Sequence, residues 1–494
     1  MAQTPTLQEI RDFKGTYPKQ LIYLFGTEMW ERFCFYGLRG MLTVFMVTEL
    51  GLAEKAANLQ YGAIQAFVYA FTFLGGVFAD KILGFQKSLF WGALLMIIGG
   101  FVIAAAPKEF FYIGICFNII GTGFFKPNIS TMVGQLYNEG DARRDAGFGL
   151  FYMGINVGAF LGGLLMVWVG KSYSWRAAFA LVGVVMIISL INFAMRRKSL
   201  GPIGLSPLPA GMSAQRKRYL EIGTYIGSLI TIPLILLMVT NTAYTDLFMY
   251  IVGPLTLLYL AWEMRNFSRA ENRKLLAALV FIIFSIFFWA FFEQSGGSLS
   301  LFALNNLRPS LFGIPVDTNS VNNAANSLFV IVFSALVGLL WLWLSKRKAE
   351  PNSVVKFGLG FVFLAGGFYL FKSTLGMADA DGITSTEVFT FAWFVITFGE
   401  LCLSPIGLSL MTKLSPVRIQ GLMMGMWFLA SAYGQYAAGL LGAGMSAEDP
   451  NASNYDKLVL YTEGYGQLGL YALIAGGALI LLAPVVRKLM QEVK

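Results

Sequence analysis

Residues 28–39 of this chain read Glu28-Met-Trp-Glu31-Arg32-Phe-Cys-Phe-Tyr-Gly-Leu-Arg39, a charged stretch inside an otherwise apolar run. At about 100° per residue, these four charged positions share one stripe of an α-helix, and Glu28 and Arg32 form an i,i+4 acid-to-base pair. Each charge near the centre of a bilayer costs about 3 kcal/mol, so an unpaired set would oppose insertion. The stretch therefore predicts a membrane-spanning helix whose polar stripe faces a watery cavity and not lipid.

The composition of the whole chain is that of an integral membrane protein. Of its 494 residues, 56% are hydrophobic and 13% are charged, whereas about a quarter of the residues of soluble domains are charged. Apolar runs of about 18 to 28 residues recur, each long enough to cross about 30 Å of hydrocarbon. We predict an all-α membrane protein with about fourteen spanning helices. The predicted spans are 18–47, 57–80, 88–106, 110–136, 146–170, 175–195, 219–240, 243–262, 274–297, 321–344, 355–373, 385–411, 417–443 and 464–488.

Lysine and arginine concentrate in the loops on one side of these spans. Basic clusters lie at 196–198, 216–218 and 346–348, whereas the other side has isolated bases such as Lys55 and Lys108. Because short cytoplasmic loops are enriched in bases, we predict a multi-pass protein of the cytoplasmic (inner) membrane with both termini in the cytoplasm. The net charge of +9 then reflects contact with anionic lipid, and no nucleic-acid partner is expected.

The spans divide around the longest polar connection, 196–218. Six spans precede it, six follow residue 273, and the pair at 219–262 is an insert. We predict an N-terminal six-helix bundle at 1–198, a linker with two extra transmembrane helices at 199–270, and a C-terminal six-helix bundle at 271–494. Two six-helix bundles with a site at the membrane midplane are the transporter arrangement of the major facilitator type.

Three ionisable side chains lie within the predicted spans, and two of them, Lys126 and Glu400, lie far from the ends of their spans. Lys126 cannot easily reach the nearer surface, so it needs an acidic partner or an anionic ligand, and Pro127 beside it tends to kink the helix. Glu293 follows an aromatic run and precedes Gln294, where burial and a nearby base would balance and allow it to take and release a proton. Glu400 lies in mid-span. An interfacial anchor for the lysine and structural ion pairs for the two acids are the alternatives.

Single amides and aromatic residues within the apolar runs have two interpretations. Asn156 and Asn326 either bond to neighbouring helices or contact a ligand. Tyr36, Tyr69 and Trp427 either line a pocket or pack, and the sequence alone does not select them.

The chain contains no histidine, so any proton coupling must use carboxylates. The absence of histidine excludes His-ligated zinc and Ser-His or Cys-His catalysis, and no Walker-type phosphate loop is present. We therefore expect no enzymatic activity, no metal and no cofactor, with an ion gradient as the energy source.

The stretch from Glu28 to Gly37 resembles the Glu-x-x-Glu-Arg-Phe-x-Tyr-Tyr-Gly motif of the proton-dependent oligopeptide transporter (POT/PTR) family, a branch of the major facilitator superfamily. Four further segments extend this likeness: 76–87, 148–160, 288–294 and 399–405. The resemblance covers nearly the whole chain, and it includes the two inserted helices that are typical of bacterial members. One departure is Phe35, which stands where the family has its first motif tyrosine, so any bond of that hydroxyl is absent or made by water.

The resemblance implies roles for thirteen residues. The residues implied to bind a peptide carboxylate are Arg39 and Lys126. The residues implied to bind the peptide amino terminus are Asn156, Asn326 and Glu400. The residues implied to shape the side-chain pockets are Tyr36, Tyr69, Trp289 and Trp427. The residues implied to couple proton binding are Glu28, Glu31, Arg32 and Glu293. A gating salt bridge between Arg39 and Glu293 is also implied.

We therefore expect a symporter that imports dipeptides and tripeptides with protons by alternating access, with one copy of the chain sufficing. The nearest alternative is the same fold carrying another anion, such as nitrate or an organic acid. A membrane-embedded enzyme acting on peptides or lipids is a further alternative, against which the missing histidine counts.

Overall fold

The computed structural model describes residues 4–138, 140–141, 143–403, 407–449 and 451–491. The chain folds into two compact units. Unit 1 comprises Met1–Met41 and Phe67–Thr240, and unit 2 comprises Leu42–Ala66 and Asn241–Lys494. The division into two six-helix bundles at 1–198 and 271–494, with a linker at 199–270, stays a prediction.

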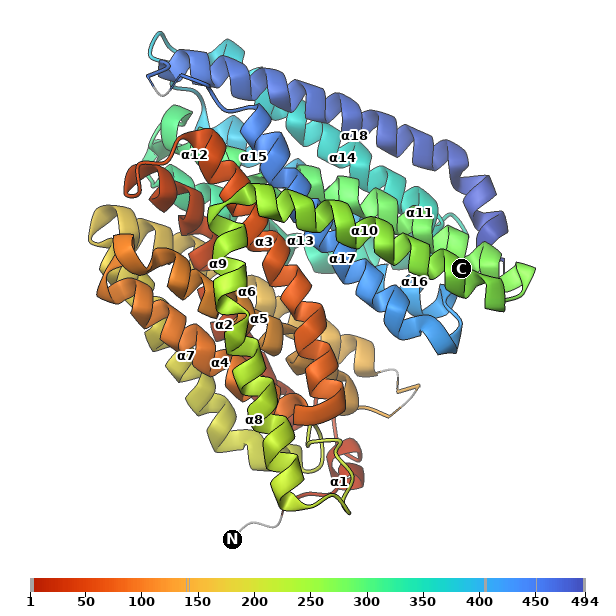
Figure 1. Cartoon of the computed structure of the whole chain (residues 1–494). Helices are drawn as coiled ribbons and strands as arrows, with labels where there is room; N and C mark the ends of the chain where they lie inside the picture. The colour runs from red at the N-terminus through yellow and green to blue at the C-terminus, as the bar shows by residue number, and fades with distance from the viewer. Residues whose placement is uncertain (1–3, 139, 142, 404–406, 450, 492–494) are drawn as a thin grey trace. The chain divides into compact units, whose positions relative to one another are not determined.

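The elements of unit 1 are helices and short helical turns (Figure 1). In order they are α1 (Leu7–Arg11), α2 (Lys19–Thr48) as far as Met41, α3 (Glu54–Phe78) from Phe67, η1 (Ala79–Leu83), α4 (Phe85–Ala105), α5 (Pro107–Gln135), α6 (Arg143–Ser172), α7 (Trp175–Arg196), η2 (Arg197–Leu200), α8 (Ala214–Ile230) and α9 (Ile232–Thr240).

Unit 2 contains the end of α2, the start of α3 and all later elements. In order the later elements are α10 (Thr242–Glu263), η3 (Met264–Asn266), α11 (Arg269–Phe292), η4 (Glu293–Gly296), α12 (Ser298–Asn306), β1 (Ser310–Leu311), β2 (Ile314–Pro315), α13 (Thr318–Lys346), α14 (Ser353–Ser373), η5 (Thr374–Met377), α15 (Thr386–Leu403), α16 (Gly407–Leu414), η6 (Val417–Ile419), α17 (Gln420–Gly444) and α18 (Asn454–Met490). In Figure 1, α14 and α18 lie side by side, and the two helices pack closely along their length.

The all-α membrane fold predicted from hydropathy is confirmed. Within the described residues, 12 helices are long and apolar enough to cross a membrane. The predicted spans 18–47 and 417–443 coincide with two further long helices, α2 and α17. The four charges of residues 28–39 and the polar Gln435 of α17 lower the hydropathy of these two helices.

The structure departs from the predicted spans where polar residues continue or interrupt a helix. Helix α11 ends at Phe292 and not at residue 297, because η4 and then α12 follow. Helix α18 begins ten residues before the predicted 464, where Ser453 caps it by accepting from the Asp456 N–H at 3.1 Å. Strands β1 and β2 form a small antiparallel hairpin across Phe312 and Gly313, both with positive φ. The last two residues of the segment 399–405 lie outside the described residues.

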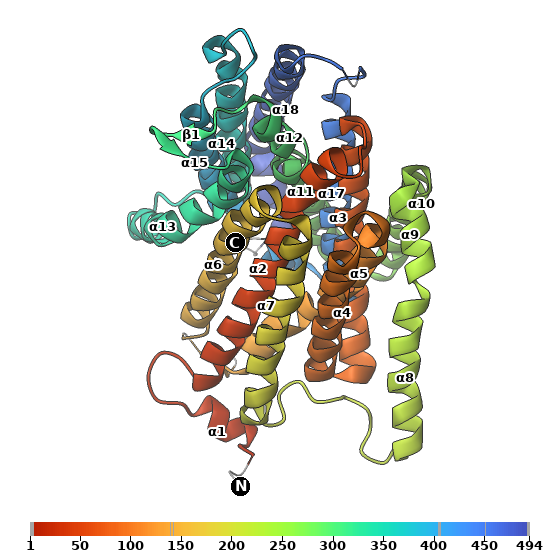
Figure 2. The same cartoon turned by 90° about the vertical axis from the view of Figure 1, so that its left-hand side faces the viewer.

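Two glycines of α6 bring this helix into backbone contact with α2. A Cβ built at Gly158 would lie 2.1 Å from the Met29 carbonyl oxygen, and one at Gly162 would lie 2.1 Å from the Phe33 carbonyl oxygen. A further contact comes from α7, where Ser189 donates to the Thr27 carbonyl at 2.7 Å. Figure 2 shows α2, α6 and α7 as neighbours. This packing leaves little freedom to the segment of α2 that carries the charged stripe.

Candidate functional site

Three of the four charges in the stripe of α2 are almost fully buried within unit 1. Glu28, Glu31 and Arg32 are 2%, 0% and 1% exposed. The Nε atom of Arg32 lies 3.3 Å from Oε1 of Glu28 and donates a hydrogen bond to Oε2 of Glu31. The i,i+4 pair expected from the spacing is therefore present, and the helical geometry adds the adjacent acid to the same guanidinium.

Each member of this triad keeps one polar atom without a protein partner. Oε2 of Glu28, Oε1 of Glu31 and Nη2 of Arg32 are buried and accept or donate no hydrogen bond within the described part of the chain. A buried polar atom without a partner costs about 1–3 kcal/mol. The two carboxylates therefore offer buried acceptor positions at which a proton can be held.

Lys126 of α5 lies beside aromatic rings. Its Nζ is 4.3 Å from the ring centroid of Tyr69 and 5.8 Å from that of Phe35. The Arg32 guanidinium lies 4.7 Å from the centroid of the same Phe35 ring. Phenylalanine at position 35 thus keeps a ring face for two cations although it lacks the hydroxyl of the family motif. Helix α5 continues through Pro127 to Gln135.

Arg39 lies further along the same stripe. Its guanidinium carbon is 5.7 Å from the ring centroid of Tyr36, and that ring packs edge to face against Phe35 at 5.1 Å. Both Arg39 and Tyr36 are partly exposed. Unit 1 therefore presents two cations, Arg39 and Lys126, among aromatic rings.

Asn156 is the candidate of unit 1 with a purely local bond. It is 6% exposed, and its Nδ2 donates to the Tyr152 carbonyl one turn earlier in α6 at 3.0 Å. This bond uses one of the two amide hydrogens of Asn156. The other hydrogen and the amide oxygen can still contact either a neighbouring helix or a ligand.

Asn326 and Glu400 are brought together within unit 2. Nδ2 of Asn326 on α13 donates to Oε2 of Glu400 on α15 at 2.8 Å and lies 3.2 Å from Oγ1 of Thr397. Asn326 and Glu400 are partly buried, and Thr397 is 1% exposed. Thr397 was not predicted, although its position three residues before Glu400 places it on the same helical face.

Glu293 opens the break between α11 and α12 and is 4% exposed. Gln294 beside it donates from Nε2 to the carbonyls of Ala290 and Ala438, each at 3.0 Å, and accepts from Ser298 at 2.7 Å. The bond to Ala290 satisfies a carbonyl in the last turn of α11, where the helix is interrupted. The bond to Ala438 ties the break to α17. The predicted pair of Glu293 with Arg39 joins residues of different units and stays a prediction.

Asn322 also holds this break, and the sequence analysis missed it. Its Nδ2 donates to the Ser295 carbonyl at 2.7 Å, while its Oδ1 accepts from Nε1 of the buried Trp393 at 3.2 Å. Asn319, one turn earlier, donates to the Ser300 carbonyl at 2.6 Å. The signal was the helical spacing of asparagines at 319, 322 and 326 in an apolar helix.

The two tryptophan candidates are partly exposed members of unit 2. Trp289 packs edge to face against Phe288 and Phe292, with centroids 5.4 and 5.5 Å away. Trp427 packs against the core of unit 2.

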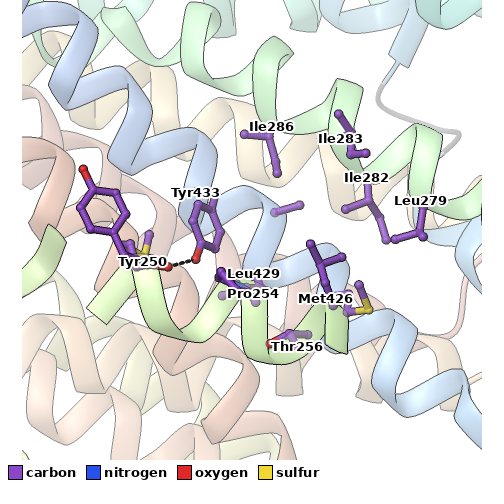
Figure 3. A pocket seen from close by; sticks show the side chains of 14 residues that line it. Tyr250, Pro254, Thr256, Leu279, Ile282, Ile283, Ile286, Met426, Leu429 and Tyr433 are labelled. Carbon is purple, nitrogen blue, oxygen red and sulfur yellow. Dashed lines mark hydrogen bonds between the residues drawn. The ribbon is translucent and has the colours of Figure 1, made fainter. Parts of the chain in front are cut away.

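An apolar cavity of about 360 Å³ in unit 2 lies apart from these residues. It is bordered by α10, α11 and α17, as the labelled Tyr250, Ile282 and Met426 show in Figure 3. Tyr433 closes one wall by donating to the Met249 carbonyl. None of the thirteen candidate residues lines this cavity, and its walls lack charge.

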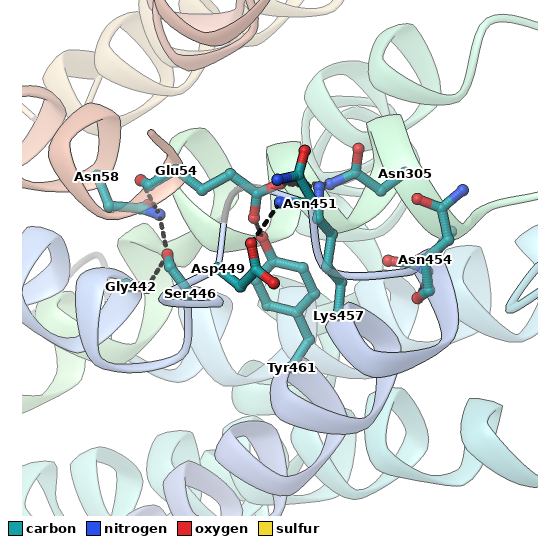
Figure 4. A network of polar contacts seen from close by, with 11 residues as sticks. Glu54, Asn58, Asn305, Gly442, Ser446, Asp449, Asn451, Asn454, Lys457 and Tyr461 are labelled. Atoms are coloured by element: carbon teal, nitrogen blue, oxygen red, sulfur yellow. Dashed lines mark hydrogen bonds and ion pairs between the residues drawn. The ribbon is translucent and has the colours of Figure 1, made fainter. Parts of the chain in front are cut away.

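A buried polar network in unit 2 was also missed from the sequence. Glu54, at the start of α3, is 8% exposed and accepts from three side chains. Asn305 of α12 donates at 2.8 Å, Lys457 of α18 lies at 2.9 Å, and Tyr461 of α18 donates to the other carboxylate oxygen. Asn58, one turn later, donates to Ser446 at 3.1 Å (Figure 4). The network fixes the start of α3 against α12, α18 and the segment just after α17.

We expect Glu54→Gln to raise amide hydrogen exchange in residues 49–58 at least ten-fold. Lys457, whose side chain is 16% exposed, then loses its counterion, and leaving such a group unpaired costs about 1–3 kcal/mol, more when it is charged. The matched control is Lys55→Gln. It removes the neighbouring pair with Glu448, which spans 3.9 Å between side chains that are 55% and 91% exposed, and exposed pairs contribute about 0–1 kcal/mol. Equal exchange in both variants would contradict this prediction.

Comparison with known proteins places the chain in a family. The model of the POT family matches residues 86–457. The chain is 32% identical to the peptide transporter YePEPT of Yersinia enterocolitica, over 98% of this chain and 97% of the relative. It is 29% identical to dipeptide and tripeptide permease A of Edwardsiella piscicida, with 94% of each chain covered.

Solved structures give the same result. The structure of a peptide transporter POT in complex with sulfate has a TM-score of 0.82 and 30% identity, covering 98% of this chain and 99% of that one. A POT family transporter in complex with 5-aminolevulinic acid has a TM-score of 0.81 and 28% identity, covering 98% and 100%. The extent of the family match and the identity over nearly the whole length both show that this chain belongs to the POT family.

Proposed function

We propose that this protein imports dipeptides and tripeptides together with protons across the cytoplasmic membrane, with both termini in the cytoplasm. The observation that carries the proposal is the distribution of charge between the units. Unit 1 presents the cations Arg39 and Lys126 among aromatic rings, and unit 2 presents the Glu400 carboxylate held by Asn326. A zwitterionic peptide offers a carboxylate to the first group and an ammonium to the second.

The names of the relatives support this substrate class. Two relatives are described as a peptide transporter and a dipeptide and tripeptide permease. A structural neighbour binds 5-aminolevulinic acid, which carries an amino group and a carboxylate at opposite ends, as a peptide does. These likenesses favour peptides over nitrate or another simple anion, and transporter relatives favour transport over catalysis.

In the proposed cycle, protons serve as the coupling ion and no cofactor takes part. Glu28, Glu31 and Arg32 hold a proton position beside Lys126, and Glu293 pairs with Arg39 until protonation releases the arginine for the peptide carboxylate. Proton and peptide then favour the same conformation, which is what coupling requires. One copy of the chain suffices for this cycle.

The network of Glu54 has a place in the same cycle. In the predicted bundles, Glu54 belongs to residues 1–198, whereas Asn305 and Lys457 belong to 271–494. On the predicted topology the start of α3 faces the outside, so this network holds the outer ends of the two bundles together. In this proposal, opening to the outside releases the ion pair between Glu54 and Lys457.

We expect Glu293→Gln to abolish uptake of labelled dialanine driven by an inward proton gradient in liposomes, while counterflow exchange of dialanine continues. The glutamine cannot change charge, so Arg39 stays available to the peptide at every stage. The control is Glu463→Gln, which removes an exposed carboxylate of the same unit.

Three outcomes would count against the proposal. Gradient-driven uptake that survives in Glu293→Gln removes this residue from coupling. Competition for wild-type uptake by nitrate but not by dialanine favours the anion alternative. Cleaved peptide in the mass spectrum of the incubation favours the enzyme.

A further inference from the structure

A second cavity, of about 510 Å³, lies within unit 1, where the start of α4 meets the connection after α7 and the helix α8. It contains none of the thirteen candidate residues. The side chains that matter for its chemistry are Lys87, Phe90, Arg197, Lys198, Ser206 and Tyr225.

Hydrogen bonds hold the walls of this cavity in place. The Gln86 N–H donates to the Gly204 carbonyl at 2.9 Å, and Gln86 Nε2 donates to the Ile203 carbonyl at 2.7 Å. Ser206 donates to the Ile82 carbonyl at 2.5 Å. Gly84 has a φ of +76°, and a Cβ there would lie 2.4 Å from the Leu205 carbonyl carbon. The connection is therefore fixed against α4, and the cavity is preformed.

The residues that line the cavity carry an excess of positive charge. Nζ of Lys87 is paired with Oε1 of Glu221 on α8 at 2.5 Å. Arg197 and Lys198 are exposed, and within the described residues no carboxylate lies within 4.0 Å of either side chain. Two cations at the rim of one concave site fit an anion with several acceptor oxygens, such as a phosphate group.

The cavity is also lined by the aromatic residues Phe90 and Tyr225. Phe90 lies one turn beyond Lys87 on α4 and is 41% exposed, and Tyr225 lies one turn beyond Glu221 on α8. Tyr225 packs on Trp91 with centroids 4.7 Å apart, and Trp91 Nε1 donates to Ser228 at 3.1 Å. Aromatic rings with a polar edge are typical of the boundary between membrane and water. On both helices, an aromatic residue therefore follows the charged residue of the Lys87–Glu221 pair by one turn.

We propose that this cavity binds the phosphate group of an anionic glycerophospholipid. Arg197 and Lys198 contact the phosphate oxygens, and the acyl chains lie along Phe90 and Tyr225. Basic pockets between membrane helices are suited to anionic headgroups. A free phosphate would use the basic residues alone and leave the aromatic residues without a function. The lipid would bridge α4 and α8, which gives the first inserted helix a structural role.

The test titrates the purified full-length protein in detergent with short-chain phosphatidylglycerol, phosphatidylcholine or inorganic phosphate and counts bound lipid by native mass spectrometry. The test variant is the double substitution R197Q/K198Q. The control is R216Q/R218Q, which removes two exposed arginines of α8 that do not line the cavity. The melting temperature without added lipid checks that both variants are folded.

We expect R197Q/K198Q to bind phosphatidylglycerol about thirty-fold more weakly than wild type, since each base near an anionic lipid contributes about 1 kcal/mol. The control should stay within about three-fold, and phosphatidylcholine should bind more weakly to all three proteins. Equal losses in the two double variants would overturn the proposal, because the attraction would then be diffuse. Displacement of phosphatidylglycerol by an equal concentration of inorganic phosphate would overturn the assignment to a lipid.

Discussion

The Arg32→Met variant is expected to lose about 3–5 kcal/mol of stability, because it leaves two buried carboxylates without their counterion. Arg32 is 1% exposed and bonds to both Glu28 and Glu31. Methionine replaces the aliphatic stem of the arginine and carries no charge. The measurement is the unfolding midpoint of the purified protein in mixed micelles of rising SDS content.

A neutral triad separates the role of charge from that of packing. In the variant E28Q/E31Q/R32M no buried charge lacks a partner, so most of the lost stability should return. Stability close to wild type in Arg32→Met itself would contradict the prediction, since it would mean that the carboxylates do not depend on the guanidinium. A triple variant as unstable as Arg32→Met would assign the loss to packing.

The charged stripe could be predicted from the sequence because its geometry is local. The spacing of Glu28, Glu31 and Arg32 along one helix fixes their mutual distances before any tertiary contact forms. The membrane spans were predictable for the same reason, since length and hydropathy are properties of a single helix. Where polar residues extend a helix, as in the first turns of α18, hydropathy alone placed its start too late.

The contacts between distant segments could not be derived in this way. Asn326 and Glu400 lie in separate apolar runs, and their spacing does not state that α13 and α15 are neighbours. Glu54 stands near the end of a loop, where a charged residue is ordinary, so nothing in its neighbourhood pointed to Lys457 more than 400 residues later. Such pairs depend on which helices pack together, and a single sequence gives no measure of that.

We expect the affinity for dialanine to fall at least thirty-fold in the variant Lys126→Met. Truncating one partner of a buried charge pair costs about 2–5 kcal/mol, which corresponds to at least a thirty-fold loss. The measurement is competition by unlabelled peptide against labelled dialanine in counterflow, which reports binding without a proton gradient.

A contact between Lys126 and the peptide carboxylate can be recognised because the loss of affinity depends on whether the ligand has a carboxylate. Dialaninamide lacks the carboxylate, so Lys126→Met should change its affinity by less than about three-fold, since a contact that is absent cannot be lost. Glu400→Gln should show the reverse pattern: a large loss for dialanine and little change for N-acetyl-dialanine, which lacks the ammonium. If Lys126→Met weakened both ligands equally, the lysine would act on the structure of the site, and the peptide carboxylate would have to be bound elsewhere. Because the two ligands differ at opposite ends, the pair of variants fixes the orientation of the peptide, which neither variant does alone.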